Sequence, residues 1–333
     1  KGKSLELGVK HLVDTVTAAK QLENGNIAGV ETKQHGLIEA DFFVDCTGFA
    51  SLLTSKTLGV PFRSYTDSLF NDRAVALPTP LEGEALASQT ISTAMKYGWA
   101  WKIPLTNRFG NGYVYSSKYI DPDDAEAELR AHIGLSDGSI EARHLRMRVG
   151  RTESSWNKNT LAVGLSQGFI EPLEATALMI VQDTVENFIT RFTDGGYSDR
   201  YRDEFNLKIN LIFDSIKDYI FMHYKLNSRS DTNYWVDNRE NELLSDSVAQ
   251  ILDVWDSGGD LLAELQRQGP RLAYSPTSWY CILAGMGRFP RKPKKPKRKT
   301  QINDPDQIRT YCERLVREFP DHWDTVAAMQ IPP

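Results

Sequence analysis

The sequence predicts a protein of mixed α and β structure, with a β-rich first part and a helical second part that divide near residue 195. Residues 68–120 alternate β-branched or aromatic residues with turn formers, whereas residues 198–329 carry apolar faces at helical spacing. Hydrophobic residues make up 41% of the 333 residues, so the chain can bury a large core. One big domain or two closely packed ones are therefore expected.

Net charge and composition indicate what kind of partner the protein binds. The net charge is -5, which favours neither nucleic acid nor an anionic membrane, and a small molecule is the expected partner. No apolar run approaches the roughly 18 residues of a membrane span, and the first residues lack the apolar core of a secretory signal. The histidines form no pair at metal-ligand spacing, so no metal site is expected. Three cysteines far apart in the chain indicate reduced, mostly buried thiols in a cytoplasmic protein: Cys46, Cys281 and Cys312.

The first predicted elements are two strands and a tight turn. Residues 12–22 and 27–34 are expected to pair around Asn24-Gly25, because this dipeptide supplies the positive φ angles of a two-residue hairpin. The stretch ADFFVDCTGF predicts a buried central strand that ends in a turn of small residues, Asp45 to Gly48. Such a turn lets a ligand approach the backbone.

Strands and helices follow one another through the middle of the chain. Helices are expected at 122–134 and 139–145, and strands at 146–165. The clearest helix lies within 168–192, where Pro172 fits a first turn. Its apolar face is expected to comprise five residues: Leu178, Val181, Val185, Phe188 and Ile189.

Two segments carry candidate chemistry. In GWAWKIP, Trp99 and Trp101 share one face of a strand and form an aromatic wall, although core packing alone is the more frequent explanation of such a pair. In the segment 164–177, a strand end passes through glycines into a helix start, where free N–H groups favour an anion. Glu171 fits a capping role there, and either Glu171 or Glu174 could be purely structural.

These segments together resemble one family. GWAWKIP matches the WxWxIP signature and FIEPLEATA is similar to the FxEPLEST(G) segment of flavin-dependent halogenases, whose best-known members are tryptophan halogenases. Further stretches fit in the same order: VDCTGF, FGNGYVYSS, MRVGR, HYKLNSRSDTNYW and WYCILAGMG. The resemblance implies a flavin-monooxygenase-like FAD-binding module of mixed sheet, here incomplete, within 1–195. A helical lobe that covers the substrate is implied at 196–333.

The resemblance also implies a reaction. A separate flavin reductase supplies reduced FAD, which reacts with oxygen to give a hydroperoxide. Bound halide, chloride or bromide, is then oxidised to hypohalous acid, which halogenates an indole or another electron-rich aromatic. The two indoles keep the organic substrate away from the flavin. Two alternatives stay open, a monooxygenase of the same fold and a non-catalytic binding descendant, and the resemblance leaves room for a homodimer.

The resemblance also implies roles for the residues at positions that match the family's functional residues. Glu174 matches the catalytic glutamate, and the backbone N–H groups of Thr176 and Ala177 match the pair that holds the halide. Four residues fall where the family contacts FAD, although packing explains them equally well: Val16, Gly48, Leu165 and Leu178.

The substrate segment differs from that of tryptophan halogenases. Tyr274 is the only aromatic near Trp279 in LQRQGPRLAYSPTSWYCILAG, so it is the candidate substrate contact, and the residues that grip a free amino acid are missing. An indole or a phenol without the zwitterion is therefore a better candidate than free tryptophan. The basic run 288–299 is expected to be a surface connection, because prolines interrupt it and no aromatic residues interleave to stack bases.

The chain also departs from the family pattern in its FAD motif. No GxGxxG is present, since Gly110-Asn111-Gly112 lacks the third glycine and a helix start. The family's catalytic lysine belongs to the same region and has no equivalent here. The sequence therefore resembles a halogenase without its N-terminal third.

These 333 residues by themselves are expected to bind FAD weakly and not to halogenate, because the phosphate-binding motif and the lysine are absent from them. A flavin fluorescence titration, followed by an assay with a flavin reductase, halide and indole, tests this expectation. Tight binding together with turnover would contradict it.

Overall fold

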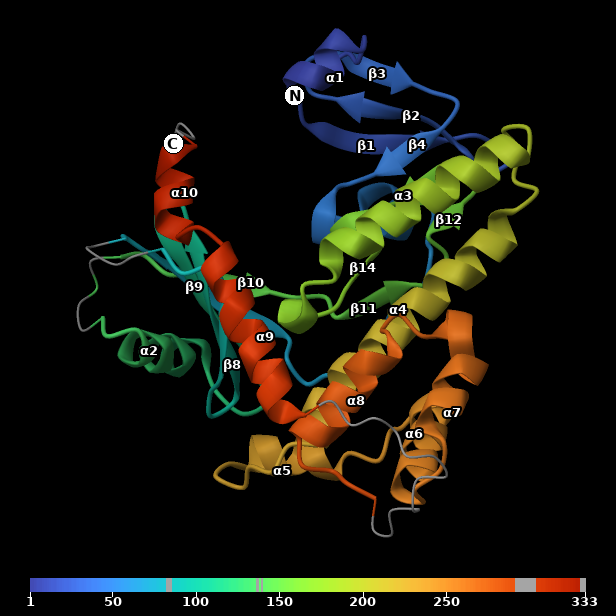
Figure 1. The fold of residues 1–333 in the computed structure, drawn as a ribbon. Coiled ribbons are helices and arrows are strands. Elements are labelled where there is room, and N and C mark those ends of the chain that lie inside the picture. Colours follow the sequence, from blue (N-terminus) through green and yellow to red (C-terminus); the bar gives the residue numbers. More distant parts are fainter. Residues whose placement is uncertain (82–85, 136–137, 139, 291–303, 330–333) are drawn as a thin grey trace. The chain divides into compact units, whose positions relative to one another are not determined.

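The chain forms two compact units in the computed structural model, which describes residues 1–81, 86–135, 138, 140–290 and 304–329 (Figure 1). Unit 1 comprises Lys1–Tyr65 and Arg148–Ile216, and unit 2 comprises Thr66–Met147 and Lys217–Pro333. Each unit draws on residues from both sides of position 195. The basic run at 288–299 lies largely outside the described residues.

Unit 1 begins with a short helix and an antiparallel meander. The elements are α1 (Gly2–Glu6), β1 (Val16–Gln21), β2 (Ile27–Thr32) and β3 (Gly36–Glu39). The predicted hairpin is confirmed, but its predicted two-residue turn is wrong. The Leu22 N–H donates to the Asn26 carbonyl oxygen at 2.8 Å, so the loop has three residues, 23–25, and of these only Gly25 has a positive φ, +82°. The third strand was not expected from the sequence.

Two further three-stranded sheets complete the strands of unit 1. One has the order β12 (Trp156–Asn157), β13 (Thr160–Ala162), β4 (Phe43–Asp45), and β13 runs parallel to β4. The other has the order β14 (Gly168–Phe169), β11 (Gly150–Thr152), β5 (Phe62–Ser64). Short turns follow β4 and β13: η1 (Gly48–Ala50), η2 (Leu52–Thr57) and η3 (Gly164–Ser166).

Helix α3 (Ala177–Asp194) packs on unit 1 through one side of its apolar surface. The Phe188 ring lies 4.9 Å from that of Phe42 and 5.0 Å from that of Trp156. The prediction of the buried face was only partly right, because Phe188 is buried whereas Leu178, Val185 and Ile189 are exposed. Periodicity detects an apolar arc but does not tell which neighbours cover it.

The start of α3 also differs from the prediction. Pro172 begins a separate turn, η4 (Pro172–Glu174), and Ala175 follows in the left-handed conformation with φ 53°. The long helix therefore starts only at Ala177. Glu171 occupies the N-cap position of η4, but its side chain makes no capping hydrogen bond, so the predicted capping role is wrong.

Unit 2 contains a five-stranded antiparallel sheet with one face covered by a helix. The order is β10 (Arg143–Arg146), β6 (Arg73–Thr79), β9 (Arg108–Tyr115), β8 (Gly98–Leu105), β7 (Ile91–Ala94). Helix α2 (Pro122–His132) places Ala125 and Leu129 against Val75, Tyr113 and Tyr115 of this sheet. The helix predicted at 139–145 is wrong, because Arg143–Arg146 pairs with β6 and the described residues before it, 140–142, form no helix.

The helical half of the chain is confirmed. Helix α4 (Arg202–Lys225) continues from unit 1 into unit 2, where its residues Tyr219 and Met222 join Ile251, Leu265 and Trp279 in one buried cluster. The other helical elements are α5 (Asn233–Glu240), α6 (Asp246–Asp256), α7 (Leu261–Gln268), η5 (Gly269–Arg271), α8 (Pro276–Gly285), α9 (Pro305–Glu318) and α10 (His322–Ala328). None of the helices in the described part of the chain is both long and apolar enough to cross a membrane.

The prediction of mostly buried cysteines is wrong. Cys46, Cys281 and Cys312 are all exposed free thiols. Cys46 directly follows the last residue of β4, and the other two lie on α8 and α9. Near Cys281 the buried positions are Trp279, Ile282 and Leu283, so the thiol is on another side of α8.

Two glycines allow the strand β8 to pack against β9. A Cβ on Gly98 would lie 1.9 Å from the carbonyl oxygen of Val114. A Cβ on Gly112 would lie 2.1 Å from Cζ2 of Trp101, which is its cross-strand partner. The Trp101 indole therefore lies over Gly112 because that position has no side chain.

Gly112→Ala is expected to lower the free energy of unfolding by about 1–3 kcal/mol, because the methyl group overlaps the Trp101 ring. Urea unfolding measures the loss, and near-UV circular dichroism reports the displaced indole. Gly110→Ala on the same strand is the matched control, since its Cβ meets Ile103 at an ordinary 3.8 Å. Equal losses in both variants would contradict the explanation.

Candidate functional site

The aromatic pair lies on β8 in unit 2. The ring centroids of Trp99 and Trp101 are 6.0 Å apart with an interplanar angle of 56°, and Trp99 is buried while Trp101 is half-buried. Ala100, between them, packs on the α2 side of the sheet. Because alternate residues of a strand point to opposite faces, both indoles lie on the face away from α2. The predicted common face is confirmed.

The carboxylate of Asp45 organises the turn after β4 in unit 1. Its Oδ1 accepts hydrogen bonds from Oγ1 of Thr47 at 2.6 Å and from the Thr47 N–H at 3.1 Å. Its Oδ2 accepts from the N–H groups of Leu53 at 3.0 Å and Thr54 at 2.8 Å. Burial by itself raises the pKa of Asp45, but these donors outweigh burial and hold the pKa below its ordinary value.

A second set of hydrogen bonds joins this turn to the turn after β13. Oγ of Ser51 donates to the carbonyl oxygen of Ser166 at 2.9 Å, and Oγ of Ser166 donates to that of Gly48 at 3.1 Å. Gly48 and Gly164 have φ +69° and +64°, and a Cβ on Gly48 would meet nothing within 4 Å. These bonds hold the two turns, residues 48–51 and 164–166, to each other, and this backbone surface is here called the ledge. Open space lies beside Gly48.

Helix α3 begins at the end of the EPLEATA segment, and no side chain caps its first turn. Thr176 is the N-cap residue of α3 and its side chain makes no capping hydrogen bond. The first N–H groups of α3 have no partner within the helix, and together with the helix dipole they favour an anion. Glu174 is exposed and lies two and three residues before Thr176 and Ala177, the predicted halide residues.

The remaining predicted FAD residues lie in unit 1 at different places. Leu165 in η3 and Leu178 in the first turn of α3 are exposed apolar side chains, 42% and 82% accessible. The Cβ position of Gly164 lies 3.9 Å from Cγ2 of Val181, so η3 rests against α3. Val16 instead begins β1 in the separate meander, opposite Thr32. Leu165 and Leu178 thus adjoin the ledge, whereas Val16 belongs to another sheet.

Tyr274, the predicted substrate contact, lies in the helical part of unit 2. Its ring stacks on Tyr219 with the centroids 3.8 Å apart and 22° between the planes. Tyr219 in turn donates a hydrogen bond of 3.0 Å to the carbonyl oxygen of Ser278. The ring of Tyr274 is therefore held by packing against Tyr219.

The MRVGR stretch supplies an ion pair that sequence reasoning missed. Arg151 is buried, and its Nε and Nη2 donate to the two carboxylate oxygens of Asp214 at 3.1 and 3.0 Å. Tyr65 donates to the same carboxylate at 2.5 Å. Burial by itself raises the pKa of Asp214, but Arg151 and Tyr65 lower it below the ordinary value. The cluster ties the sheet containing β11 to α4.

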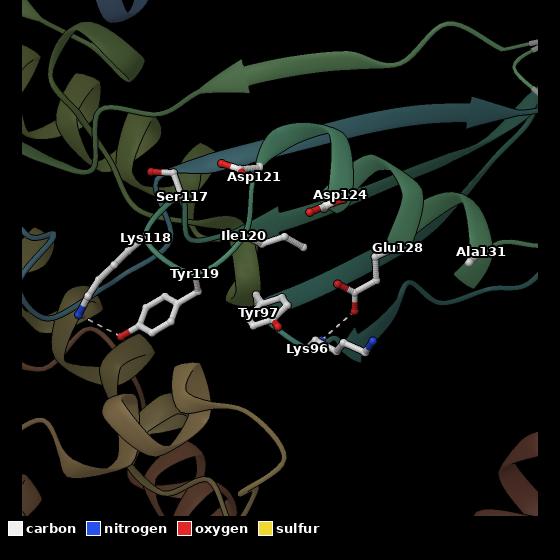
Figure 2. Close-up of a pocket in the computed structure, with 10 residues that line it drawn as sticks. All are labelled: Lys96, Tyr97, Ser117, Lys118, Tyr119, Ile120, Asp121, Asp124, Glu128 and Ala131. Atoms are coloured by element: carbon white, nitrogen blue, oxygen red, sulfur yellow. Dashed lines mark hydrogen bonds between the residues drawn. The ribbon is translucent and has the colours of Figure 1, made fainter.

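Unit 2 has a cavity of about 570 Å³ beside α2 that the sequence did not predict (Figure 2). The Lys96 N–H donates to Glu128 at 2.9 Å, and Nζ of Lys118 donates to the Tyr119 hydroxyl at 3.2 Å. Tyr119 also donates to Asp237 at 2.6 Å, and burial followed by this carboxylate raises the pKa of its hydroxyl. The phenol therefore stays protonated and serves as a donor.

Unit 1 has a cavity of about 720 Å³ with aromatic and charged walls. It is lined by Trp156, Phe192, Lys158 and Tyr197, and the last two have φ 52° and 61°. These cavities are lined by residues other than the predicted site residues. Within the described part of the chain, no group of His, Cys, Asp and Glu residues is suited to hold a metal ion.

Comparison with known proteins supplies the family. A family model described as tryptophan halogenase matches residues 1–301. The tryptophan 6-halogenase SttH of Streptomyces toxytricini is 38% identical over 98% of this chain and 63% of its own length. The 7-chloro-L-tryptophan 6-halogenase KtzR of Kutzneria sp. (strain 744) is 39% identical over 86% of this chain and 55% of its own length.

Solved structures agree with these sequences. Tar14, a tryptophan C-6 flavin-dependent halogenase from taromycin biosynthesis, superposes with a TM-score of 0.90 at 38% identity. The match covers 99% of this chain and 66% of Tar14. BrvH, a flavin-dependent halogenase from Brevundimonas sp. BAL3, superposes with a TM-score of 0.86 at 31% identity. The chain thus spans about half to two thirds of the length of the relatives it matches.

Asp45→Asn is expected to lower the free energy of unfolding by about 3 kcal/mol at pH 7, because two buried N–H donors lose a charged acceptor. The folded-state pKa of Asp45 is depressed, so its carboxylate stabilises the fold above the unfolded pKa of about 4. This contribution is lost as the pH falls through the lower folded-state pKa. The difference between wild type and variant should accordingly shrink below about pH 4.

Urea unfolding between pH 3 and pH 7 measures this difference. Asp41→Asn is the control, since Asp41 is exposed just before β4, and its effect should stay within about 0.5 kcal/mol. A difference for Asp45→Asn that does not change with pH would contradict the assigned role.

Proposed function

This chain belongs to the tryptophan halogenase family, and from that premise we propose that it provides the halide-holding and proton-handling part of a flavin-dependent halogenase. The observation that carries the proposal is the uncapped start of α3 directly after the EPLEATA turn. The left-handed Ala175 separates η4 from α3, so that Glu174 and the first N–H groups of the helix are set side by side in the chain.

FAD fits the ledge of unit 1. Gly48 leaves open space beside a turn whose backbone is fixed from both sides, and Leu165 and Leu178 offer exposed apolar surface next to it. We assign these three residues to FAD, and Val16 to its more distant parts. When bound and reduced by a flavin reductase, FAD supplies the activated oxygen that oxidises the halide.

The residues of this chain have separate tasks in the proposal. The N–H groups of Thr176 and Ala177 hold the halide through the helix dipole. The carboxylate of Glu174 orients the hypohalous acid and takes the proton from the halogenated ring carbon. Trp99 and Trp101 exclude the organic substrate from the flavin, so that oxygen is transferred to halide and not to carbon.

The proposed substrate is an electron-rich aromatic with an indole ring. SttH and KtzR are both named for halogenation of tryptophan or chlorotryptophan, which supports an indole as the reacting group. The segment before α8 offers Tyr274, held against Tyr219, and no acidic residue between Leu265 and Trp279 to grip an amino acid. We therefore propose an indole without the zwitterion, and indole and tryptophan compared as competing substrates would distinguish the two.

Bromide is expected to bind at the start of α3, which line broadening of the ⁸¹Br NMR signal detects. Ala177→Asp places a carboxylate in the first turn, where it suits the helix dipole but repels a halide. Bromide affinity should fall at least tenfold by this charge effect, while the fold is kept. Ala177→Asn is the neutral control of the same shape and should retain most of the binding.

The variant Glu174→Gln separates halide binding by the N–H groups from proton transfer by the carboxylate. It leaves the N–H donors in place, so bromide binding should persist in this variant. The proposal would be contradicted if wild-type protein produced no broadening, or if Ala177→Asp and Ala177→Asn behaved alike.

A further inference from the structure

Three buried polar side chains form a chain of hydrogen bonds inside unit 1. Nε2 of Gln167 donates to Oγ of Ser155 at 2.9 Å and to Oγ1 of Thr184 at 3.0 Å. Oγ1 of Thr184 donates in turn to Oε1 of Gln167 at 3.3 Å. The exposed fractions of Ser155, Gln167 and Thr184 are 2%, 0% and 0%, and these residues are here called the Gln167 bridge. Buried polar groups cost free energy unless each has a partner, so the bridge is held in one geometry.

The bridge connects the ledge to helix α3. Gln167 directly follows Ser166, whose hydroxyl and carbonyl oxygen make the two hydrogen bonds of the ledge. The backbone before Gln167 is therefore fixed, while the side chain of Gln167 reaches Thr184 on α3. The segment between the two ends of this contact, 168–183, contains Glu174 and the proposed halide residues.

Thr184 is placed to fix α3 along its own axis. In α3, which the structure describes throughout, the buried residues are Ile180, Thr184 and Phe188, of which Thr184 is the polar one. Packing of Phe188 holds the direction of the helix, but apolar contacts are non-directional and permit small shifts along the axis. A hydrogen bond requires a defined distance and angle. Ala177 lies about 10.5 Å along the axis from Thr184 and within about 20° of the same side of the helix, so the bridge fixes the first turn of α3 relative to the ledge.

We propose that Gln167 and Thr184 are positioning residues that set the separation between the ledge and the halide-holding N–H groups at the start of α3. This inference rests on the halide site proposed above. The fold by itself does not require the bridge, because replacing both members of a buried hydrogen bond by apolar groups of the same shape is nearly neutral for stability. A reaction between two bound species does require a fixed separation, since a displacement of about 1 Å can cost about a hundredfold in rate.

The separation can be measured in the full 333-residue chain by pulsed electron paramagnetic resonance between two spin labels. One label is attached to Cys46, which is exposed and lies two residues before Gly48 of the ledge. The other is attached after the substitution Ile189→Cys, at an exposed position of α3. Cys281→Ser and Cys312→Ser remove the other exposed thiols. One narrow distance is expected when the bridge is intact.

The variant without the bridge combines Ser155→Ala, Gln167→Met and Thr184→Val. It should unfold at about the same urea concentration as the wild type, because no polar group of the bridge is left buried alone. The label distance should shift by about 1–2 Å, the usual size of a shift of a packed helix. Bromide affinity, from the ⁸¹Br line broadening, should fall about tenfold, because the donors are no longer preorganised. Thr184→Val by itself keeps the bond between Gln167 and Ser155, so it should give smaller effects in the same direction, and it decides the test if the triple variant does not fold.

Two further variants separate position from stability. Thr184→Ser keeps the hydroxyl group and should match the wild type in label distance and in bromide affinity. Asn159→Ala removes side-chain hydrogen bonds to Ile27 and Asp41, which do not belong to α3. It should therefore lower stability and leave the label distance and the bromide affinity unchanged. Circular dichroism verifies the fold of each variant.

The label distance and the bromide affinity distinguish the possible failures. A folded triple variant with the wild-type distance would overturn the inference, and so would equal effects of Thr184→Ser and Thr184→Val. A shifted distance with unchanged bromide affinity would refute the link between the position of α3 and halide binding. A wild-type chain that binds no bromide would contradict the proposed halide site, while the distance would still decide whether the bridge positions α3.

Discussion

The buried carboxylate of Asp45 is the interaction on which the candidate site of unit 1 depends. β4 and β13 are parallel, so the turns after both strands emerge at the same edge of the sheet. Ligands of such sheets bind at the carboxyl ends of the strands, and Asp45 fixes the first of these turns by four hydrogen bonds. The bonds between Ser51, Ser166 and Gly48 then hold the second turn to it.

The backbone is strained at Ala175, between Glu174 and the proposed halide-binding N–H groups of α3. Ala175 adopts a left-handed conformation at φ 53°, which costs a non-glycine residue about 1 kcal/mol. The result is that α3 starts three residues after Glu174 and is not continuous with η4. Strain kept at one point of a site is typical of positions that serve a ligand and not the fold.

The local part of this structure could be predicted from the sequence, and the long-range part could not. Asn24-Gly25 predicts the hairpin, and the spacing of Trp99 and Trp101 determines their common face. The residues at 143–146 form a strand because β6 accepts them, which no local pattern shows. The pairing of Arg151 with Asp214, the exposure of Cys46 and the uncovered side of α3 depend on neighbours distant in sequence.

The functional features of α3 follow one another along a single helix. Its first N–H groups face the proposed halide, Leu178 in the first turn is assigned to FAD, and Phe188 further along is buried. An 18-residue helix is a rigid rod of about 27 Å. The packing of Phe188 on Phe42 and Trp156 therefore also fixes the direction of the N–H donors at the start of the helix. A donor set that is held in this way loses less entropy when an anion binds.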